Sequence, residues 1–309
     1  EISACLVGSE MCIRDRNRPM FILFSTNLPH GPVDIPPAEN KYAGHPAIRQ
    51  AYAGAAGGNR ECAGAAEEYA SMVDKLDRQV GAILAQVHKL GLEKRTIIVF
   101  SSDNGHELYY RTDKERGRGL NCHGGVLDGT GELLDVFRGS RGLIGQKNAM
   151  VNLAGLKWTN HEGGIRVPLI VSWPGTVPHG KVCRSLVANY DHMATFAELA
   201  GVGMPEGKDS VSYKNMLFGK PSSQRDYVVV DHTVITGDGW KLTHKQDKWL
   251  LFQISSDPEE RHNLAETRKD QLERLQAIYR KEAGSPRKDR QKPEQPRKTA
   301  LFPPLAFAG

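Results

Sequence analysis

Apolar residues recur at steps of three and four along residues 65–91, which is the spacing of one face of an α-helix. Gly91 follows this segment and can end the helix, because glycine adopts the left-handed backbone of a helix C-cap at little cost. A compact apolar run at 19–25 (PMFILFS) is long enough for one buried strand, and further strands are predicted at 96–100 (TIIVF) and 167–173 (VPLIVSW). A Pro/Gly-punctuated loop follows the first of these runs.

A second helix begins at Asp191, a good capping residue, and runs through Ala200 to Gly201. Strands that alternate with helices in this way favour a parallel sheet covered by helices on both faces. After about residue 205 the pattern changes to short strands followed by a helix. The predicted strands are 227–231, 239–244 and 248–254, and the helix carries Leu272, Leu275, Ile278 and Tyr279. This part predicts a small α+β subdomain.

Four segments follow from these patterns: 1–17 as an artefact or a disordered end, 18–205 as an α/β core, 206–283 as the α+β subdomain, and 284–309 as a disordered tail. Residues 285–299 hold six Lys or Arg and two acidic residues, so they supply +4 of the formal net charge of +5. The rest of the chain is near neutral, and we expect no nucleic-acid partner. No apolar run approaches the length of a membrane span.

The first residues lack the order of charged and apolar segments that marks a signal peptide. Residues 6–16 (LVGSEMCIRDR) resemble one reading frame of a widely used sequencing-library adapter. We therefore expect the biological sequence to start near Asn17. The five cysteines show no zinc-binding spacing, and their odd number leaves the redox compartment undecided.

Polar residues stand where two of the predicted strands end. His30 lies in the loop after the first strand, and Asp103, Asn104 and Gly105 directly follow the second. Ligands collect beyond the carboxyl ends of strands in an open α/β sheet, and carboxylate and amide oxygens suit Ca²⁺ or Mg²⁺ better than zinc. We expect Gly105 to allow a sharp turn behind these side chains. The alternative is an ordinary strand-end turn, where Asp, Asn and Gly are all common.

Five motifs occur along the chain in an order that closely resembles the sulfatase family of the alkaline-phosphatase superfamily. They are LPHGP, FSSDNGHE, LKWTNHEGGIRVPLIVSWPG, YDHMATFAELAGV and WKLTHKQDKWLLFQISSDPEERHNLAE. The resemblance extends from about Pro19 to about Ala283. It implies an alkaline-phosphatase-like three-layer α/β sandwich with a partial central sheet and helices on both faces, plus the small C-terminal α+β subdomain.

The resemblance also implies roles for particular residues. Asp103 and Asn104 match two ligands of the family's divalent cation, Ca²⁺ rather than Mg²⁺. Lys157 matches the lysine that holds a sulfate oxygen and the nucleophile, and a cation suits the charge on a transferring sulfuryl group. His30 matches a histidine that contacts the sulfate or ester oxygen and helps to protonate the leaving group. His106, next to the metal ligands, is a candidate substrate-binding residue, as are His30 and Lys157.

Other residues near these motifs have less specific expectations. Glu162 and Arg166 are expected to brace the EGGIR turn rather than to touch substrate. His161 stands where many relatives carry an aromatic residue, so it can face the site or only pack. The long Gly-rich stretch between Gly105 and Gly155 is expected to shape the substrate pocket together with the C-terminal subdomain.

One expected component is missing from the sequence. The family's nucleophile is a Cys or Ser in a C/S-x-P-x-R motif, oxidised to formylglycine, and neither a cysteine nor a serine of this chain lies in such a motif. The paired acidic residues that complete the family's metal site are absent too. We interpret both absences as truncation, and expect the chain by itself to be inactive.

The intact parent is expected to be a sulfuric ester hydrolase that cleaves sulfate monoesters of carbohydrates or aryl alcohols. One alternative is a phosphodiesterase or phosphonate hydrolase of the same superfamily, and another is a non-catalytic binding protein on the same fold. The resemblance suggests export to the periplasm or exterior. It does not identify the sulfate ester, exo or endo action, or the oligomeric state.

Overall fold

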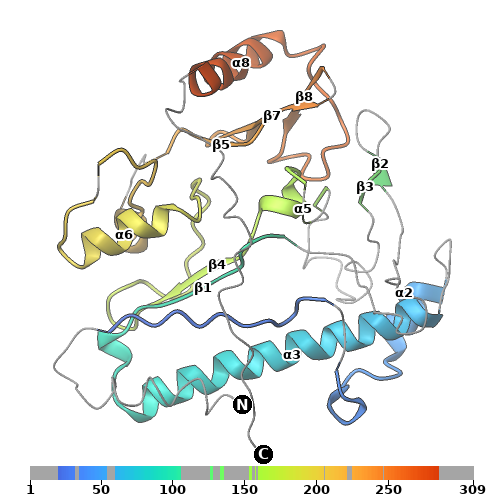
Figure 1. The fold of residues 1–309 in the computed structure, drawn as a ribbon, viewed down its shortest axis with the longest axis vertical. Coiled ribbons are helices and arrows are strands. Elements are labelled where there is room, and N and C mark those ends of the chain that lie inside the picture. Colours follow the sequence, from blue (N-terminus) through green and yellow to red (C-terminus); the bar gives the residue numbers. More distant parts are fainter. Residues whose placement is uncertain are drawn as a thin grey trace, which may run out of the picture.

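The computed structural model describes residues 20–31, 35–53, 60–105, 126–127, 133–135, 153–154, 157, 159–204, 206–220, 225–245 and 247–284 (Figure 1). The adapter-like start, His106, most of the Gly-rich stretch and the basic tail lie outside these residues. The described elements are η1 (Pro37–Glu39), α2 (Pro46–Ala53), α3 (Arg60–Lys89), η2 (Glu93–Arg95), β1 (Ile98–Ser101), β2 (Val126–Leu127), β3 (Leu133–Asp135), α5 (Glu162–Ile165), β4 (Leu169–Ser172), α6 (Asp191–Leu199), α7 (Lys214–Leu217), β5 (Tyr227–Val230), β6 (Thr233–Thr236), β7 (Trp240–Lys245), β8 (Lys248–Gln253) and α8 (Lys269–Gly284).

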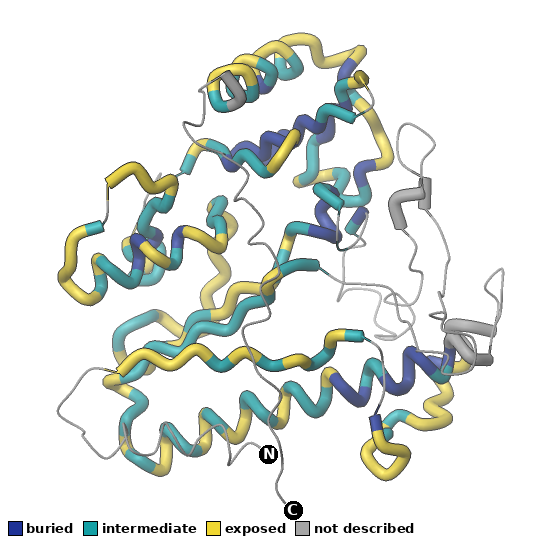
Figure 2. The backbone as a smooth tube through the Cα atoms, in the orientation of Figure 1, coloured by how far each residue is buried: buried dark blue, intermediate teal, exposed yellow. Residues whose placement is uncertain are grey.

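The long helix predicted from the apolar spacing is α3, and it ends as expected. Gly91 has φ +65°, and the backbone N–H of Leu92 donates to the carbonyl of Val87 across the helix end. The N-terminal part of α3 is buried and its C-terminal part is half-buried or exposed (Figure 2). A small apolar core lies at the buried end, formed by Ile35, Ile48, Ala65, Ala66 and Met72.

The strands β1 and β4 pair antiparallel, with Ile98 opposite Ser172 and Ser101 opposite Leu169. The parallel arrangement predicted for these two strands is therefore wrong. A parallel neighbour requires a crossover connection, usually a helix, whereas no helical period links β1 to β4 in the sequence. The alternation of element types cannot by itself give strand direction.

The apolar run at 19–25 was predicted to be a buried strand, and this too is wrong for its described residues. Residues 20–25 do not form a β-strand, and Phe21 and Leu23 are 76% and 79% exposed. The segment runs extended between α3 and the β1–β4 pair (Figure 1), and Phe21 meets Phe196 of α6 edge-on at 6.3 Å between ring centroids. A strand needs a hydrogen-bonding neighbour, and the described residues supply none here.

The C-terminal subdomain is a four-stranded antiparallel sheet in the order β5-β6-β7-β8, with α8 packed against it. The predicted strands and helix are present, and β6 (TVIT), which the sequence reading missed, completes the sheet. The core between sheet and helix includes Val234, Leu242, Leu251 and Leu275, all fully buried. Lys241 also has 0% exposure, although apolar residues surround it along β7. A buried ammonium needs compensating charge, which comes from Glu260 of the subdomain and Glu162 of the α/β core.

Candidate active site at the end of β1

Asp103 and Asn104 lie directly beyond β1 and are held by local hydrogen bonds. The backbone N–H of Asn104 donates to Asp103 Oδ1 at 2.9 Å, and Asn104 Nδ2 donates to the Gly105 carbonyl at 2.9 Å. The Ser102 hydroxyl donates to the Asn104 carbonyl at 2.8 Å. Within the described residues, Asp103 Oδ2 and Asn104 Oδ1 accept no hydrogen bond. Two hard oxygen donors therefore remain available for a cation.

Gly105 fixes this loop against α5 by a close backbone approach. Its N–H donates to the Gly164 carbonyl at 2.8 Å, and a Cβ atom at position 105 would lie 1.8 Å from the carbonyl oxygen of Gly163. The sequence reading expected Gly105 to permit a sharp turn, but its φ lies outside the left-handed region. The glycine is required because the EGG backbone occupies the space of a side chain.

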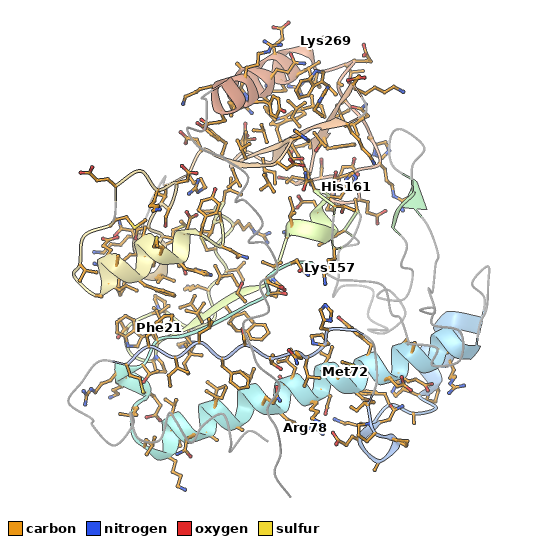
Figure 3. The ribbon with its side chains drawn as sticks, in the orientation of Figure 1. Phe21, Met72, Arg78, Lys157, His161 and Lys269 are labelled. Atoms are coloured by element: carbon orange, nitrogen blue, oxygen red, sulfur yellow. The ribbon has the colours of Figure 1, made fainter. Side chains whose placement is uncertain are left out.

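Lys157 and His30 approach each other from positions 127 residues apart in the chain, with Lys157 Nζ 3.0 Å from His30 Nε2. His30 Nδ1 lies 2.5 Å from the carbonyl oxygen of Gly31, which can only accept a hydrogen bond. Nδ1 therefore carries a proton, and Nε2 is the acceptor that faces the lysine ammonium. Lys157 is half-buried near the end of β1 and below α5 in the view of Figure 3, and His30 is exposed.

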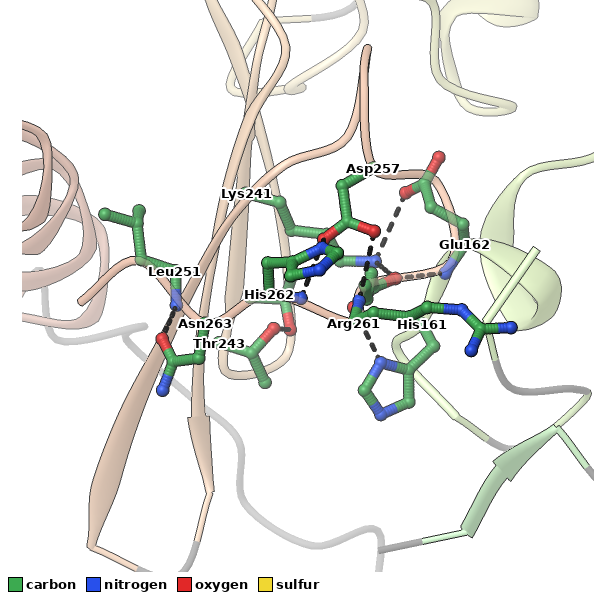
Figure 4. A network of polar contacts seen from close by, with 11 residues as sticks. His161, Glu162, Lys241, Thr243, Leu251, Asp257, Arg261, His262 and Asn263 are labelled. Carbon is green, nitrogen blue, oxygen red and sulfur yellow. Dashed lines mark hydrogen bonds and ion pairs between the residues drawn. The ribbon is translucent and has the colours of Figure 1, made fainter. Parts of the chain in front are cut away.

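A buried polar network joins α5 to the C-terminal subdomain (Figure 4). Both carboxylate oxygens of Glu260 are occupied: Oε2 by His161 Nδ1 at 2.7 Å, and Oε1 by the Glu162 N–H at 2.8 Å and Lys241 Nζ at 2.9 Å. Lys241 Nζ also donates to Glu162 Oε1 at 3.2 Å. The carboxylate of Glu260 thus satisfies the first N–H group of α5, a group that has no partner within the helix.

The network contains buried charges of both signs, and each charged side chain depends on its partners in place of water. The Glu162, Lys241 and Glu260 side chains are at most 4% exposed. Burial by itself raises the pKa of Glu260, but the charge of Lys241 and the hydrogen bond from His161 outweigh it, so the pKa lies below its ordinary value. Arg166 lies 3.6 Å from the second oxygen of Glu162, which agrees with the expected bracing of the EGGIR turn.

The sequence reading missed Lys241 and Glu260 as partners of this turn. The signal was present in WKLTH, where a lysine occupies an alternating apolar strand, and in DPEE. The structure adds that His161, for which two positions were considered, is 6% exposed and packs with Glu260. No group of three or more His, Cys, Asp or Glu residues that could hold a metal occurs within the described part of the chain. No helix in that part is long and apolar enough to cross a membrane.

Two protein-family models match the sequence. The model described as Sulfatase matches residues 7–202, which is more than half of the chain. The chain belongs to the sulfatase family. A second model, described as N-sulphoglucosamine sulphohydrolase, C-terminal, matches residues 157–283 and so covers both Lys157 and the subdomain that carries Glu260. The sulfatase resemblance inferred from the motifs is confirmed.

Individual sulfatases are similar over part of their length. N-acetylgalactosamine-6-O-sulfatase of Bacteroides thetaiotaomicron is 26% identical over 226 residues, which cover 66% of this chain and 39% of that protein. A Bacteroides thetaiotaomicron structure from work on the metabolism of multiple glycosaminoglycans has a TM-score of 0.63 at 21% identity, covering 90% of this chain and 53% of the other. A structure in complex with its substrate, D-glucosamine-2-N,6-O-disulfate, has a TM-score of 0.51 at 21% identity, covering 73% and 42%.

These structural likenesses confirm the predicted α/β fold class with its partial sheet. The chain spans about half the length, or less, of the relatives it matches. The roles of Lys157, His30, Asp103 and Asn104 therefore stay predictions.

Replacing Gly105 by Ala should destabilise the protein by about 1–3 kcal/mol or more, because the new methyl group would overlap the Gly163 carbonyl. Urea unfolding of the purified chain measures this loss. Gly203→Ala is the matched control, since a Cβ at position 203 meets nothing within 4 Å. Equal stability of the two variants would contradict the close approach.

Replacing Glu260 by Gln should cost about 3–5 kcal/mol near neutral pH, because it leaves buried Lys241 with one carboxylate. The folded-state pKa of Glu260 lies below its ordinary value of 4.5. Its stabilising contribution is therefore complete above that pH and is lost as the pH falls through the folded value. The stability difference between wild type and variant should shrink below about pH 4.5 in unfolding titrations. The exposed-pair control Glu259→Gln should change stability by less than about 1 kcal/mol, and a pH-independent difference for Glu260→Gln would refute the assignment.

Proposed function

We propose that this chain is part of a sulfuric ester hydrolase and that Lys157 and His30 hold the sulfate group of the substrate. The proposal rests on one contact above all, the 3.0 Å approach of Lys157 Nζ to His30 Nε2. This contact gathers a cation and a titratable base at the end of β1, where ligands bind in open α/β sheets. Membership of the sulfatase family supports the same reaction class.

The chemistry expected of the pair follows from the charge that moves in sulfate ester cleavage. As the sulfur–oxygen bond to the leaving alcohol breaks, negative charge grows on that oxygen and is shared with the other sulfate oxygens. The ammonium of Lys157 stabilises charge on the sulfate oxygens. When an anionic sulfate group enters, it can take over the hydrogen bond that Lys157 donates to His30. His30 Nε2, released from that hydrogen bond, can take up a proton from solvent and pass it to the departing alcohol oxygen.

Asp103 and Asn104 would hold a divalent cation beside this pair. Their available atoms, Asp103 Oδ2 and Asn104 Oδ1, are hard oxygen donors and so fit Ca²⁺, with Mg²⁺ as a weaker candidate. Because Ca²⁺ takes about six to eight oxygen ligands, these two would form part of its shell. The cation would supply positive charge for the sulfate group. The family resemblance assigns the attacking oxygen to a formylglycine, and no C/S-x-P-x-R motif for it occurs in this sequence.

The proposed substrates are sulfated hexosamines within glycans. One relative is named as an N-acetylgalactosamine-6-O-sulfatase, and one structural neighbour holds D-glucosamine-2-N,6-O-disulfate as its substrate. His106 is proposed to contact the substrate because it follows the cation ligands in the sequence, although it lies outside the described residues.

Replacing Lys157 by Ala in the complete enzyme from the source organism should lower kcat/KM for a sulfate ester by roughly 30- to 1,000-fold, equivalent to about 2–4 kcal/mol of lost transition-state stabilisation. Steady-state kinetics with 4-nitrophenyl sulfate measures the loss. Lys181→Ala, at an exposed lysine after β4, is the control and should change the rate less than twofold. A loss below tenfold for Lys157→Ala would remove Lys157 from this role.

The 309-residue chain itself should not turn over 4-nitrophenyl sulfate, since it contains no C/S-x-P-x-R nucleophile motif. The assay is release of 4-nitrophenol by the purified chain in the presence of Ca²⁺. Robust turnover, abolished by Lys157→Ala, would show that another group serves as nucleophile.

A further inference from the structure

The segment that carries Lys157 also touches the C-terminal subdomain at an exposed point. Asn160 lies three residues after Lys157, and its Nδ2 donates to Asp231 Oδ2 at 3.3 Å. Successive Cα atoms are about 3.8 Å apart, so the Cα atoms of residues 157 and 160 are separated by at most about 11 Å. The proposed sulfate ligand and the contact to the C-terminal subdomain therefore come from one short segment of the chain.

Asp231 and His232 form the turn between β5 and β6, and both side chains face solvent. Their side chains are 63% and 60% exposed, and His232 Nε2 lies 3.5 Å from Asp231 Oδ1. His232 Nδ1 lies 3.1 Å from the hydroxyl of Tyr279 on α8, which orients the imidazole. Asp231 has φ +50°, a conformation that Asp adopts more readily than most residues. The turn thus presents a carboxylate and an imidazole beside the amide of Asn160.

We propose that Asn160, Asp231 and His232 form the subsite that recognises the sugar ring of a sulfated glycan. This inference rests on the proposed function, because it assumes that the sulfate group is held at Lys157. Sugar hydroxyl and amine groups both donate and accept hydrogen bonds, and a carboxylate, an amide and an imidazole provide the complementary acceptors and donors. An aryl sulfate has no such groups on its ring, so the subsite would separate glycan sulfates from aryl sulfates.

The three proposed subsite residues are more exposed than the buried Glu260 network, which begins one residue after Asn160. His161 and Glu162, the next two residues along the chain, are at most 6% exposed and bond to Glu260. The buried pair fixes the backbone, while Asn160 remains half-buried with its amide toward the solvent-exposed turn. A recognition group held on a rigid segment loses little conformational freedom when a ligand binds.

The test measures binding to the 309-residue chain, so it does not require turnover. N-acetylgalactosamine 6-sulfate and 4-nitrophenyl sulfate are titrated into wild type and Asp231→Ala by ligand-observed NMR. Loss of hydrogen bonds to a charged group should raise the Kd for the sulfated sugar by about tenfold or more, and leave the Kd for the aryl sulfate within about twofold. Equal effects on both ligands, or no effect on the sugar, would overturn the proposal.

Asp247→Ala is the matched control for backbone strain. Asp247 is also exposed, has φ +61° in the turn between β7 and β8, and makes no hydrogen bond to Asn160 in the described part of the chain. It should bind both ligands like wild type, and a loss equal to that of Asp231→Ala would overturn the proposal. Asn160→Ala, whose backbone φ is not positive, is a second variant and should repeat the selective loss for the sugar.

Lys157→Ala separates this proposal from the proposed function. If both hold, Lys157→Ala weakens both sulfated ligands, whereas Asp231→Ala weakens the sugar alone. If Lys157→Ala binds both ligands normally while Asp231→Ala still loses the sugar, the sulfate-binding role fails and the sugar subsite stands. A wild-type chain that binds neither ligand at millimolar concentration overturns the subsite.

Discussion

The arrangement of the candidate site depends on the contact between two backbones, at Gly105 and at Gly163–Gly164. Because no Cβ atom separates them, the Gly105 N–H reaches the Gly164 carbonyl at 2.8 Å. The loop with Asp103 and Asn104 is thereby held against α5, whose N-terminus follows the Lys157 segment. Two motifs far apart in the sequence, SDNG and EGG, therefore act as one rigid unit. Gly105 is needed for packing rather than for an unusual backbone angle.

The Glu260 network extends this unit to the C-terminal subdomain. Removing charged groups from water costs several kcal/mol for each ion, and a buried ion pair often contributes little net stability. The network is nevertheless directional, since Glu260 accepts three hydrogen bonds, two of which come from His161 and the Glu162 backbone. Apolar packing of similar area would not specify the orientation of α5 in this way. We interpret the subdomain as a structural support for the site, and the second family match covers both, from residue 157 to residue 283.

The hydrophobic pattern predicted which helices and strands form better than it predicted how the strands pair. The stripe of α3 and the apolar runs of β1, β4 and the C-terminal sheet could be recognised from their spacing and composition, although β1 is only half-buried and β4 is largely exposed. Strand direction could not, since it depends on the path of the chain between β1 and β4. The run at 19–25 is apolar enough for a strand, but pairing depends on neighbours that composition does not reveal. The short threonine-rich β6 lacks a strong apolar signal and was missed.

The candidate site, like the fold, could be predicted only in part from the sequence. The SDNG and EGG motifs and Lys157 could be found because their local sequence is specific, and the structure brings Lys157 to His30, while the roles of both stay predictions. Glu260 and Lys241 were missed despite the lysine in WKLTH, because an acid in a turn and a lysine in a strand are usually solvated, and their partners are 98 and 79 residues away. Their burial becomes visible only once the subdomain is docked on α5.

The exposed and buried polar groups of the site have different physical tasks. Lys157 is half-buried and His30 is exposed, and an anionic group can replace the hydrogen bond between them without leaving a buried charge unpaired. His161, Glu162, Lys241 and Glu260 are buried, and separating them would leave charge uncompensated in a region of low dielectric. Ligand exchange is therefore inexpensive at the first pair, while the second group keeps the backbone in place. A rigid buried support beneath an exchangeable cationic contact would suit the sulfate-binding role proposed for Lys157 and His30.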